Sequence, residues 1–360
     1  TAGQRQSYKP IVSAIELRNR KKDIDNALFK IFGKKKIKKI LLINPSDANK
    51  DTFDFDRSHR KRNSDYPPYG LLIVGRHLLN HGYDVEILNL QHELSKECIL
   101  TSDKKKFNFE IFWKKCLWSK IKSFKPDLIS VTCLFSVTHN SYKDVCQEIK
   151  NSKSLSDNGL EKIPIATGGV HLSHDPDNIL SEIKEIDIGF LNEGELSFVS
   201  LVDYQNGSKN VDELSMTYIR NNHNEFIKID IDGRPKHLDL EIIPAYELIK
   251  VDEYSKYGTI GSWSAFRENI KIGTVLSNRG CRAQCTFCNV RVFNGVGVRQ
   301  RSIDSVIEEL SLLKSRYGID HISWLDDDLL KDEKRAIELF NLMVSKKLQS
   351  SWDATNGLIA

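Results

Sequence analysis

The sequence predicts an α/β protein in which a doubly wound parallel sheet precedes a second region of alternating strands and helices. Strand and helix alternate along most of the chain from residue 37 onward. The strand segments are short and apolar at nearly every position, as in parallel strands that are buried on both faces. With 360 residues, 40% hydrophobic and 28% charged, the chain has a composition typical of globular proteins and is long enough for two domains.

The N-terminal residues 1–36 are expected to form a basic helical extension, with an amphipathic helical segment over 10–32. Residues 1–62 contain 17 Lys and Arg against 7 Asp and Glu, and the densest basic run is 34–39. Such a run can contact nucleic acid or another anion. No nucleic-acid-binding motif accompanies it, so we interpret it as a solvated face and expect no nucleic-acid partner.

The first domain is expected over residues 37–205, with ligands bound beyond the carboxyl ends of its strands. Its expected strands are 40–43, 85–88, 128–132, 164–167 and 186–190. Helices are expected over 71–80, 107–124 and 139–150, and again after residue 195. Gly82 is placed to end the first of these helices, and Pro126 the second.

Residues 206–270 break the alternation and are expected to link two domains. Within them, 217–219 and 226–229 can pair as a hairpin. The second domain begins at residue 271, with strands expected over 272–276, 321–325 and 352–355. Ser302 and Asp332 are placed to cap the intervening helices, and Gly318 to end the first of them.

Three of the seven cysteines are clustered, and they carry the clearest chemical signal in the chain. Cys281, Cys285 and Cys288 have the spacing C-x3-C-x2-C and follow the first strand of the second domain. Three thiolates in one loop suit a cubane iron–sulfur cluster. A full [4Fe–4S] set would need a fourth ligand, so one iron is left open. An open metal position indicates that the site is catalytic and not only structural.

Two other interpretations of the cysteines are structural zinc and chance spacing. Zinc would need a fourth Cys or His at short spacing, and His321 is the nearest candidate. The remaining cysteines, Cys98, Cys116, Cys133 and Cys146, are scattered and are expected to behave as small buried apolar residues or idle thiols.

The second domain resembles the radical S-adenosylmethionine (SAM) superfamily. The carrying residues are 277–280, the cysteine motif with Phe287, 298–302, 317–319 and 321–328. The resemblance implies a (βα)6 partial TIM barrel, a [4Fe–4S] cluster at the carboxyl end of its strands, and SAM bound to the open iron. A reduced cluster would cleave SAM to a 5′-deoxyadenosyl radical that abstracts hydrogen from a substrate.

The same resemblance implies roles for five residues in SAM binding. Phe287 would lie near the adenine, and Asp326 or Asp327 would receive the methionine ammonium. The sequence departs here from the usual Gly-Gly-Glu motif, and a solvated acidic loop is the alternative. Arg299 and Arg301 would contact the SAM carboxylate or support the loop.

The first domain resembles the cobalamin-binding, Rossmann-like domain that precedes this barrel in one large subclass. The carrying segments are 43–45, 66–71, 125–129, 167–171 and 192–195. The cobalamin-contacting residues implied by this resemblance are Tyr69, Gly70, Thr132, Gly168, Gly169, His171, Glu193 and Gly194. Each segment read alone is an ordinary turn, so the prediction rests on the set.

The element Asp-x-His-x-x-Gly, whose histidine ligates cobalt in many cobalamin proteins, is absent. The segment Asp56-Arg57-Ser58-His59 has the wrong spacing and lacks the glycine, and His171 and His174 are expected to be polar loop residues. The resemblance therefore implies cobalamin held without a protein histidine. It is also compatible with a domain that has lost cobalamin.

The second domain is shorter than a whole barrel. At roughly 30 residues per βα unit, six units need about 180 residues, whereas residues 271–360 supply 90. We therefore expect the chain to be a fragment or one piece of a longer protein, with the barrel truncated.

Together these features predict a cobalamin-dependent radical SAM enzyme, most often a methyltransferase acting on an unactivated carbon or phosphorus. Alternatives are a ring-forming or rearranging enzyme with the same cofactors, and a non-catalytic protein that binds cobalamin and a cluster. A methylthiotransferase is less expected than these, because its preceding domain should carry a second cysteine cluster. The expected partners are a small-molecule substrate and an electron donor such as flavodoxin or ferredoxin. No apolar run approaches a membrane span and residues 1–30 lack the apolar core of a secretory signal, so we expect a cytoplasmic protein without membrane contact.

Overall fold

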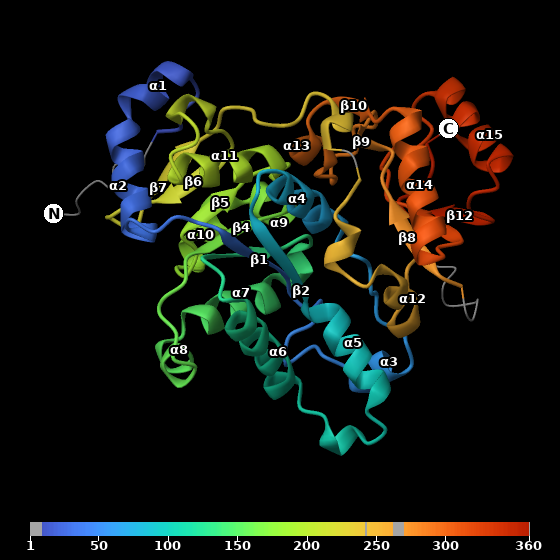
Figure 1. Cartoon of the computed structure of the whole chain (residues 1–360), viewed down its shortest axis with the longest axis horizontal. Coiled ribbons are helices and arrows are strands. Elements are labelled where there is room, and N and C mark those ends of the chain that lie inside the picture. The colour runs from blue at the N-terminus through green and yellow to red at the C-terminus, as the bar shows by residue number, and fades with distance from the viewer. Residues whose placement is uncertain (1–8, 242, 262–269, 360) are drawn as a thin grey trace. The chain divides into compact units, whose positions relative to one another are not determined.

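The computed structural model of the chain describes residues 9–241, 243–261 and 270–359, and it divides into two compact units (Figure 1). The first unit comprises Thr1–Pro45, His77–Glu86 and Lys120–Arg234. The second unit comprises Ser46–Arg76, Ile87–Ser119 and Pro235–Ala360. Three elements have residues in both units: α4 (Tyr69–Asn80), β2 (Asp84–Asn89) and α6 (Phe109–Phe124).

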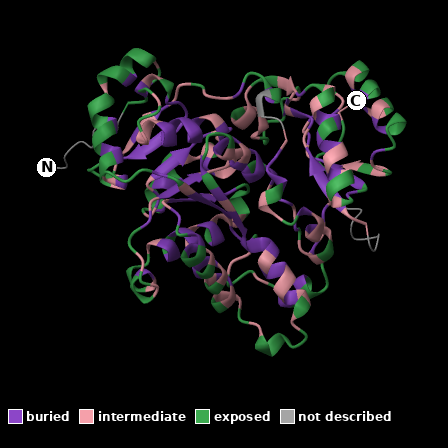
Figure 2. Ribbon diagram, viewed as in Figure 1, coloured by how far each residue is buried: buried purple, intermediate pink, exposed green. Residues whose placement is uncertain are grey.

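The first unit is built on a seven-stranded sheet with the order β2-β1-β3-β4-β5-β6-β7. The strands after β2 are β1 (Lys39–Asn44), β3 (Leu128–Thr132), β4 (Ile165–Gly168), β5 (Ile188–Phe190), β6 (Thr217–Arg220) and β7 (Phe226–Ile229). Strands β1, β3, β4 and β5 pair in parallel, and β6 and β7 continue the sheet antiparallel. The central strands are buried along nearly their whole length, which explains their continuous apolar runs (Figure 2).

The first unit also contains helices that belong to it alone. They are α1 (Ala14–Asn19), α2 (Lys21–Phe32), α7 (His139–Lys150), α8 (Ser152–Asp157), α9 (Val170–His174), α10 (Pro176–Glu182) and α11 (Glu195–Gln205). Helix α7 contacts β3, α9 contacts β4 and β5, and both α2 and α11 contact β6. The order 2-1-3 at the start of the sheet creates a switch point between β1 and β3, beyond whose carboxyl ends ligands of doubly wound sheets bind.

The second unit contains a three-stranded parallel sheet with the order β12-β11-β8. Its strands are β8 (Ile272–Val275), β11 (His321–Trp324) and β12 (Ser351–Ala354), joined through helices α14 (Ile303–Tyr317) and α15 (Glu333–Ser345). The Ser302 hydroxyl accepts from Ser305 N and caps α14, and Asp332 accepts from Arg335 N and caps α15. Gly318 ends α14 in the left-handed conformation. These strands and caps match the predicted alternation of parallel strands and helices after residue 271.

The other helices of the second unit are α3 (Phe55–His59), α5 (Leu90–Leu100), α12 (Tyr254–Tyr257) and α13 (Val290–Asn294). A two-stranded antiparallel sheet pairs β9 (Asn278–Cys281) with β10 (Gly297–Gln300). The sequence predicted neither α5 nor this sheet. Leu90–Leu100 lacks a clean amphipathic period, because buried Gln91, His92 and Ser95 interrupt its apolar face.

The domain boundaries differ from those expected at residues 36, 205 and 270. The hairpin 217–229 forms as anticipated, but it extends the first sheet, so the first unit continues to Arg234. The N-terminal extension is helical as expected, and it is tied to this hairpin by hydrogen bonds between Ile11 and both Lys228 and Asp230. Residues 235–261 belong to the second unit, where Tyr246, Tyr254 and Ile260 are buried.

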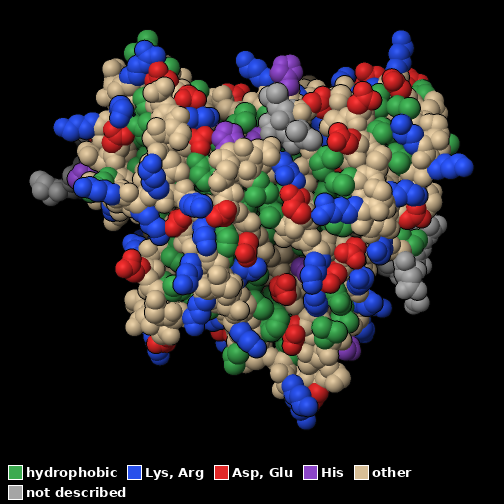
Figure 3. Space-filling model, in the orientation of Figure 1, with side chains coloured by type: hydrophobic (Ala, Val, Ile, Leu, Met, Phe, Trp, Pro, Cys, Tyr) green, Lys and Arg blue, Asp and Glu red, His purple; other side chains and the backbone are tan. Residues whose placement is uncertain are grey.

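Basic side chains near the N-terminus form surface ion pairs. Lys21 pairs with Asp25 at 2.6 Å, Lys35 pairs with Asp127 at 2.8 Å, and Arg18 also reaches a carboxylate. Figure 3 shows Lys and Arg interspersed with Asp and Glu on the face drawn. This arrangement supports the interpretation of the basic extension as a solvated face. Among the described helices, none has both the length and the apolar character needed to cross a membrane.

Candidate active site

The three clustered cysteines lie on one segment beyond the carboxyl end of β8. Cys281 is the last residue of β9, opposite Gly297 of β10. All three are free cysteines, and Cys285 and Cys288 are exposed to solvent. The backbone turns between them, because Cys288 N donates to Cys285 O at 3.2 Å. A donor set of three free, accessible thiols on eight residues fits the soft ligand requirement of an iron–sulfur cluster.

The structure does not gather these thiols into a closed metal geometry. Across residues 9–241, 243–261 and 270–359, no group of three or more His, Cys, Asp or Glu side chains is arranged to hold a metal ion. The Cys281 sulfur accepts from Ala283 N at 3.4 Å, a contact that orients one potential ligand. The fit of a cluster therefore rests on the type and spacing of the donors.

Gly280 makes the hairpin beside Cys281 feasible. Its φ is +98°, and a Cβ atom there would overlap the Gly297 carbonyl oxygen across the hairpin. Only glycine allows this close approach of the two backbones. The glycine that precedes the cysteine motif therefore has a structural reason, which the sequence alone did not reveal.

Of the other cysteines, Cys98, Cys133 and Cys146 are buried and Cys116 is half-buried. Burial raises the pKa of Cys98 to about 12 and the pKa of both Cys116 and Cys133 to about 11, and it also raises that of Cys146. These thiols stay protonated at neutral pH, whereas metal ligation needs a thiolate. His321, the candidate fourth zinc ligand, hydrogen-bonds Ser351 and Asp353 through its two ring nitrogens, at 2.8 and 3.1 Å.

The acidic segment after β11 places its three carboxylates in different environments. Asp326 is fully buried and accepts from Ser277 N, Ser277 Oγ and Asn278 N at 2.6–2.9 Å. Burial nevertheless raises its pKa to about 6. Asp327 is half-buried, accepts only a 3.4 Å contact from Asn356 among the described residues, and has a pKa raised to about 6 by burial. Of the two carboxylates predicted for the SAM ammonium, Asp327 is therefore the more available.

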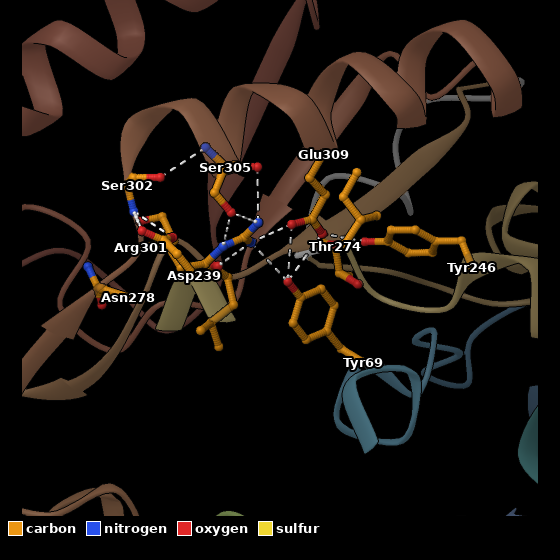
Figure 4. Close-up of polar contacts among 12 residues, drawn as sticks. Tyr69, Asp239, Tyr246, Thr274, Asn278, Arg301, Ser302, Ser305 and Glu309 are labelled. Carbon is orange, nitrogen blue, oxygen red and sulfur yellow. Dashed lines mark hydrogen bonds and ion pairs between the residues drawn. The ribbon is translucent and has the colours of Figure 1, made fainter. Parts of the chain in front are cut away.

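Arg301 lies in a buried polar cluster instead of an open site (Figure 4). Its guanidinium pairs with Glu309, and it donates to Leu276 O at 3.0 Å. Glu309 is fully buried and also accepts from the hydroxyls of Tyr246 at 2.6 Å and Tyr69 at 3.1 Å. The alternative role, support of the loop, matches this geometry better than contact with a ligand. Sequence inspection missed Glu309, which looks like any helix residue.

Arg299 is held by contacts to backbone oxygens, whereas the Phe287 side chain is exposed to solvent. Arg299 lies on β10 and donates to the backbone oxygens of Asn294 and Pro235, so it braces the far end of the cysteine loop. The Phe287 side chain, between Cys285 and Cys288, is 89% exposed. An aromatic ring this open to solvent next to the thiols is free to pack on a flat ligand.

In the first unit, the loops after β3 and β4 meet at the carboxyl edge of the sheet. Thr132 ends β3, and its hydroxyl donates to Gly168 O of β4 at 3.5 Å. Gly169 follows with φ +110°, and a Cβ atom there would overlap the Cys133 carbonyl oxygen. Three predicted cobalamin contacts, Thr132, Gly168 and Gly169, are thus brought together near the switch point.

Both ring nitrogens of His171 are within hydrogen-bond distance of neighbouring side chains. Its Nδ1 is 2.9 Å from Ser136 Oγ, and its Nε2 is 2.9 Å from His139 Nδ1. Burial and the neighbouring His139 and His174 lower its pKa. The predicted Glu193 is buried and Gly194 precedes α11, both in the loop that follows β5.

Tyr69 and Gly70, the other predicted cobalamin contacts, begin α4 and belong to the second unit. The Tyr69 hydroxyl is engaged with Glu309, and Gly70 is exposed. Sequence inspection missed an apolar stretch after β3, in which the side chains of Leu134, Phe135 and Val137 are 52–86% exposed. Its signal was an apolar run that continues past the strand end.

Comparisons with known proteins agree with this architecture. The B12 binding domain family matches residues 59–202. An uncharacterized methyltransferase from Pyrococcus horikoshii is 30% identical over 66% of this chain and 47% of its own. Cytidylyl-2-hydroxyethylphosphonate methyltransferase from Streptomyces wedmorensis is 26% identical over 90% of this chain and 60% of its own. The chain thus spans about half the length of these curated relatives.

A solved structure extends the comparison to the fold. The cobalamin-dependent S-adenosylmethionine radical enzyme OxsB, with aqua-cobalamin and SAM bound, superposes with a TM-score of 0.64. The match covers 88% of this chain and 38% of that one at 15% identity, so it supports the fold alone. The expected α/β fold class is confirmed: residues 59–202 match the B12 binding domain family, and the fold is similar to that of OxsB.

Proposed function

We propose that this chain, with its B12 binding domain and radical SAM fold, is part of a cobalamin-dependent radical SAM methyltransferase. One observation supports this most strongly. Three free cysteines with cluster spacing follow the first strand of a parallel β/α unit, in the same chain as a B12 binding domain. Neither feature alone would select the subclass. Both relatives described above are named methyltransferases, which favours methyl transfer as the outcome.

In this proposal, Cys281, Cys285 and Cys288 hold a [4Fe–4S] cluster whose fourth iron is open to SAM. When bound, the cluster supplies the electron that cleaves SAM, and cobalamin supplies a methyl carrier. Asp327 lies after β11 with few competing contacts and would accept from the SAM ammonium. The exposed Phe287 ring would cover the adenine.

Cobalamin would bind at the carboxyl edge of the first sheet. Thr132, Gly168 and Gly169 form a backbone surface without bulky side chains, and the exposed apolar loop 134–137 borders it. Both ring nitrogens of His171 are engaged by neighbours, so this histidine supports binding without a protein ligand to cobalt. Glu193, Gly194, Tyr69 and Gly70 remain predicted contacts.

The proposed substrate is a small molecule with an unactivated carbon or phosphorus as methyl acceptor. The phosphonate substrate in the name of one relative favours phosphorus chemistry as one option. We also propose flavodoxin or ferredoxin as electron donor and the cytoplasm as compartment. A ring-forming or rearranging enzyme would share both cofactors, and product analysis separates it from a methyltransferase.

The proposal is tested by incubating the anaerobically reconstituted, reduced chain with SAM and measuring 5′-deoxyadenosine. We expect 5′-deoxyadenosine from the unmodified chain and from Cys116→Ala, whose thiol lies outside the motif. We expect none from Cys285→Ala. A cluster that forms without yielding 5′-deoxyadenosine would support the non-catalytic alternative, and an absence of cobalamin absorption on the purified, cobalamin-loaded chain would remove the second cofactor.

A further inference from the structure

Asp328 contacts the cysteine segment directly, although it was not among the residues predicted for the site. Its carboxylate is fully buried. Oδ2 accepts from the backbone N of Arg282 at 3.2 Å and pairs with Arg282 Nε at 3.2 Å. Its backbone oxygen accepts from Asn278 Nδ2 at 3.0 Å. Asp328 therefore links the end of β11 to both β9 and the first residue of the cysteine loop.

Arg282 is the residue on which this contact acts. It directly follows Cys281 and precedes Cys285 by three positions, so its backbone direction sets the course of the loop. Its side chain is 36% exposed, and its terminal nitrogen donates to Ile359 O at 2.6 Å. The arginine is held at the backbone and at the guanidinium, which restricts both its φ/ψ angles and its side chain.

The pairing is energetically significant because only one partner is in water. A buried carboxylate needs a compensating charge or several donors. Arg282 supplies both, whereas the second oxygen of Asp328, Oδ1, is buried without a hydrogen-bond partner in the described part of the chain. Loss of Arg282 would leave Asp328 with no counter-charge that the structure records, so the two residues should act as one unit.

Asp326, two residues earlier, makes related contacts to the segment that leads into β9. It fixes Ser277 and Asn278, the residues that lead into β9, and Ser277 O accepts from Arg301 N at 3.0 Å and from Arg335 at 3.2 Å. The alternate carboxylates 326 and 328 thus face the cysteine segment, and Asp327 between them does not contact it in any recorded hydrogen bond.

We propose that Asp328 is a positioning residue that acts through Arg282 to fix the loop carrying Cys281 and Cys285 for cluster binding. This inference rests on the proposed function, because it assumes a cluster on the three cysteines. Groups that hold the ligands of a metal site in place typically change its metal affinity by about 10–100-fold when removed. We expect the Asp328–Arg282 pair to lie in this range.

The test compares Asp328→Asn, Arg282→Gln and the double variant with Asp304→Asn, an exposed aspartate on α14. After anaerobic reconstitution, each protein is mixed with an iron chelator and the rate of iron loss is measured. We expect about tenfold faster loss from each single variant, no further increase in the double variant, and no change in Asp304→Asn. Effects that multiply in the double variant, or unchanged rates in both singles, would overturn the pairing.

A second readout separates positioning from general loss of folding. The midpoint potential of the cluster depends on nearby charge and hydrogen bonds. Removing the Asp328 charge should raise the potential, removing the Arg282 charge should lower it, and the double variant should lie near the unmodified protein. Shifts of the same sign would contradict the Asp328–Arg282 clamp, the pair of residues proposed to fix the cysteine loop. If Asp328→Asn fails to fold, as seen by thermal unfolding, Arg282→Gln alone still tests it through both readouts.

Failure of this inference can be told apart from failure of the proposed function. If the unmodified chain takes up no iron–sulfur cluster, the proposed function is wrong and the clamp has no role. If the unmodified chain takes up the cluster and both single variants retain it with unchanged kinetics and potential, only the clamp is wrong.

Discussion

Replacing Glu309 by glutamine removes the single negative charge from the buried polar cluster that joins α14 to β8 and α4. Glu309 is fully buried, pairs with Arg301, and accepts from the hydroxyls of Tyr246 at 2.6 Å and Tyr69 at 3.1 Å. Glutamine has nearly the same shape and keeps one acceptor oxygen. The change therefore isolates the charge without opening a cavity.

The expected cost follows from what Arg301 retains. Breaking a buried ion pair by removing one partner typically costs about 3–5 kcal/mol. Arg301 keeps hydrogen bonds to Leu276 O at 3.0 Å and Ser305 O at 3.1 Å, which places the cost at the lower end. We expect Glu309→Gln to lower the free energy of unfolding of the second unit by about 3 kcal/mol.

The neighbouring Glu308→Gln is a matched control, because Glu308 lies on the exposed side of the same helix. We expect it to change the free energy of unfolding by no more than about 0.5 kcal/mol. Both variants are measured by urea unfolding, with the denaturant slope checked for equality. If Glu309→Gln is as stable as Glu308→Gln, the Glu309 charge does not support the buried polar cluster.

Two further predictions concern the carboxylate beside β9 and the sheet edge of the first unit. Burial raises the pKa of Asp326 from 3.8 to about 6, so the folded state binds more protons than the unfolded state. The contribution of Asp326 to the free energy of unfolding therefore falls as the pH rises from about 4 through 6. The total change in the free energy of unfolding that this pKa shift causes over the pH range is about 3 kcal/mol. The urea midpoint of the unmodified protein should fall more steeply over this pH range than that of Asp326→Asn, and equal slopes would contradict the assignment. In the first unit, Gly169→Ala should weaken cobalamin retention at least about tenfold, because the new Cβ overlaps the Cys133 carbonyl and a positive φ costs about 1–2 kcal/mol. Gly207→Ala is the control, since Gly207 has φ +81° and open space around it, and equal cobalamin absorption of the two purified variants would rule out a role for the Gly169 approach.

Much of the fold could be predicted because local signals and burial agree. The apolar runs at 40–43 and 128–132 are buried on both faces, and Ser302, Gly318 and Asp332 sit at helix ends as their side chains favour. Helix α5 was missed because its buried face carries polar residues: His92 reaches Asp65 at 2.8 Å and Gln91 reaches Ser64 O at 2.9 Å, across long sequence distances.

The cysteine motif could be located from spacing alone, but the roles of its neighbours could not. Adjacent carboxylates 326–328 look equivalent in sequence, and they differ only because alternate residues face β9 and its loop. By resemblance Tyr69 was expected to contact a ligand, and Arg301 either to contact a ligand or to support the loop. Both are engaged by Glu309, which lies 240 and 8 positions away in the chain. Long-range pairing of this kind leaves no local pattern in the sequence.

Whether the three cysteines hold a cluster with an iron open to SAM can be measured by electron paramagnetic resonance of the anaerobically reconstituted and reduced chain, before and after addition of SAM. We expect a cluster of about four irons per chain that is lost when any one of Cys281, Cys285 or Cys288 is replaced by alanine. The spectrum of this cluster should change when SAM binds the open iron. Zinc in place of iron, or a cluster spectrum that SAM leaves unchanged, would contradict this expectation.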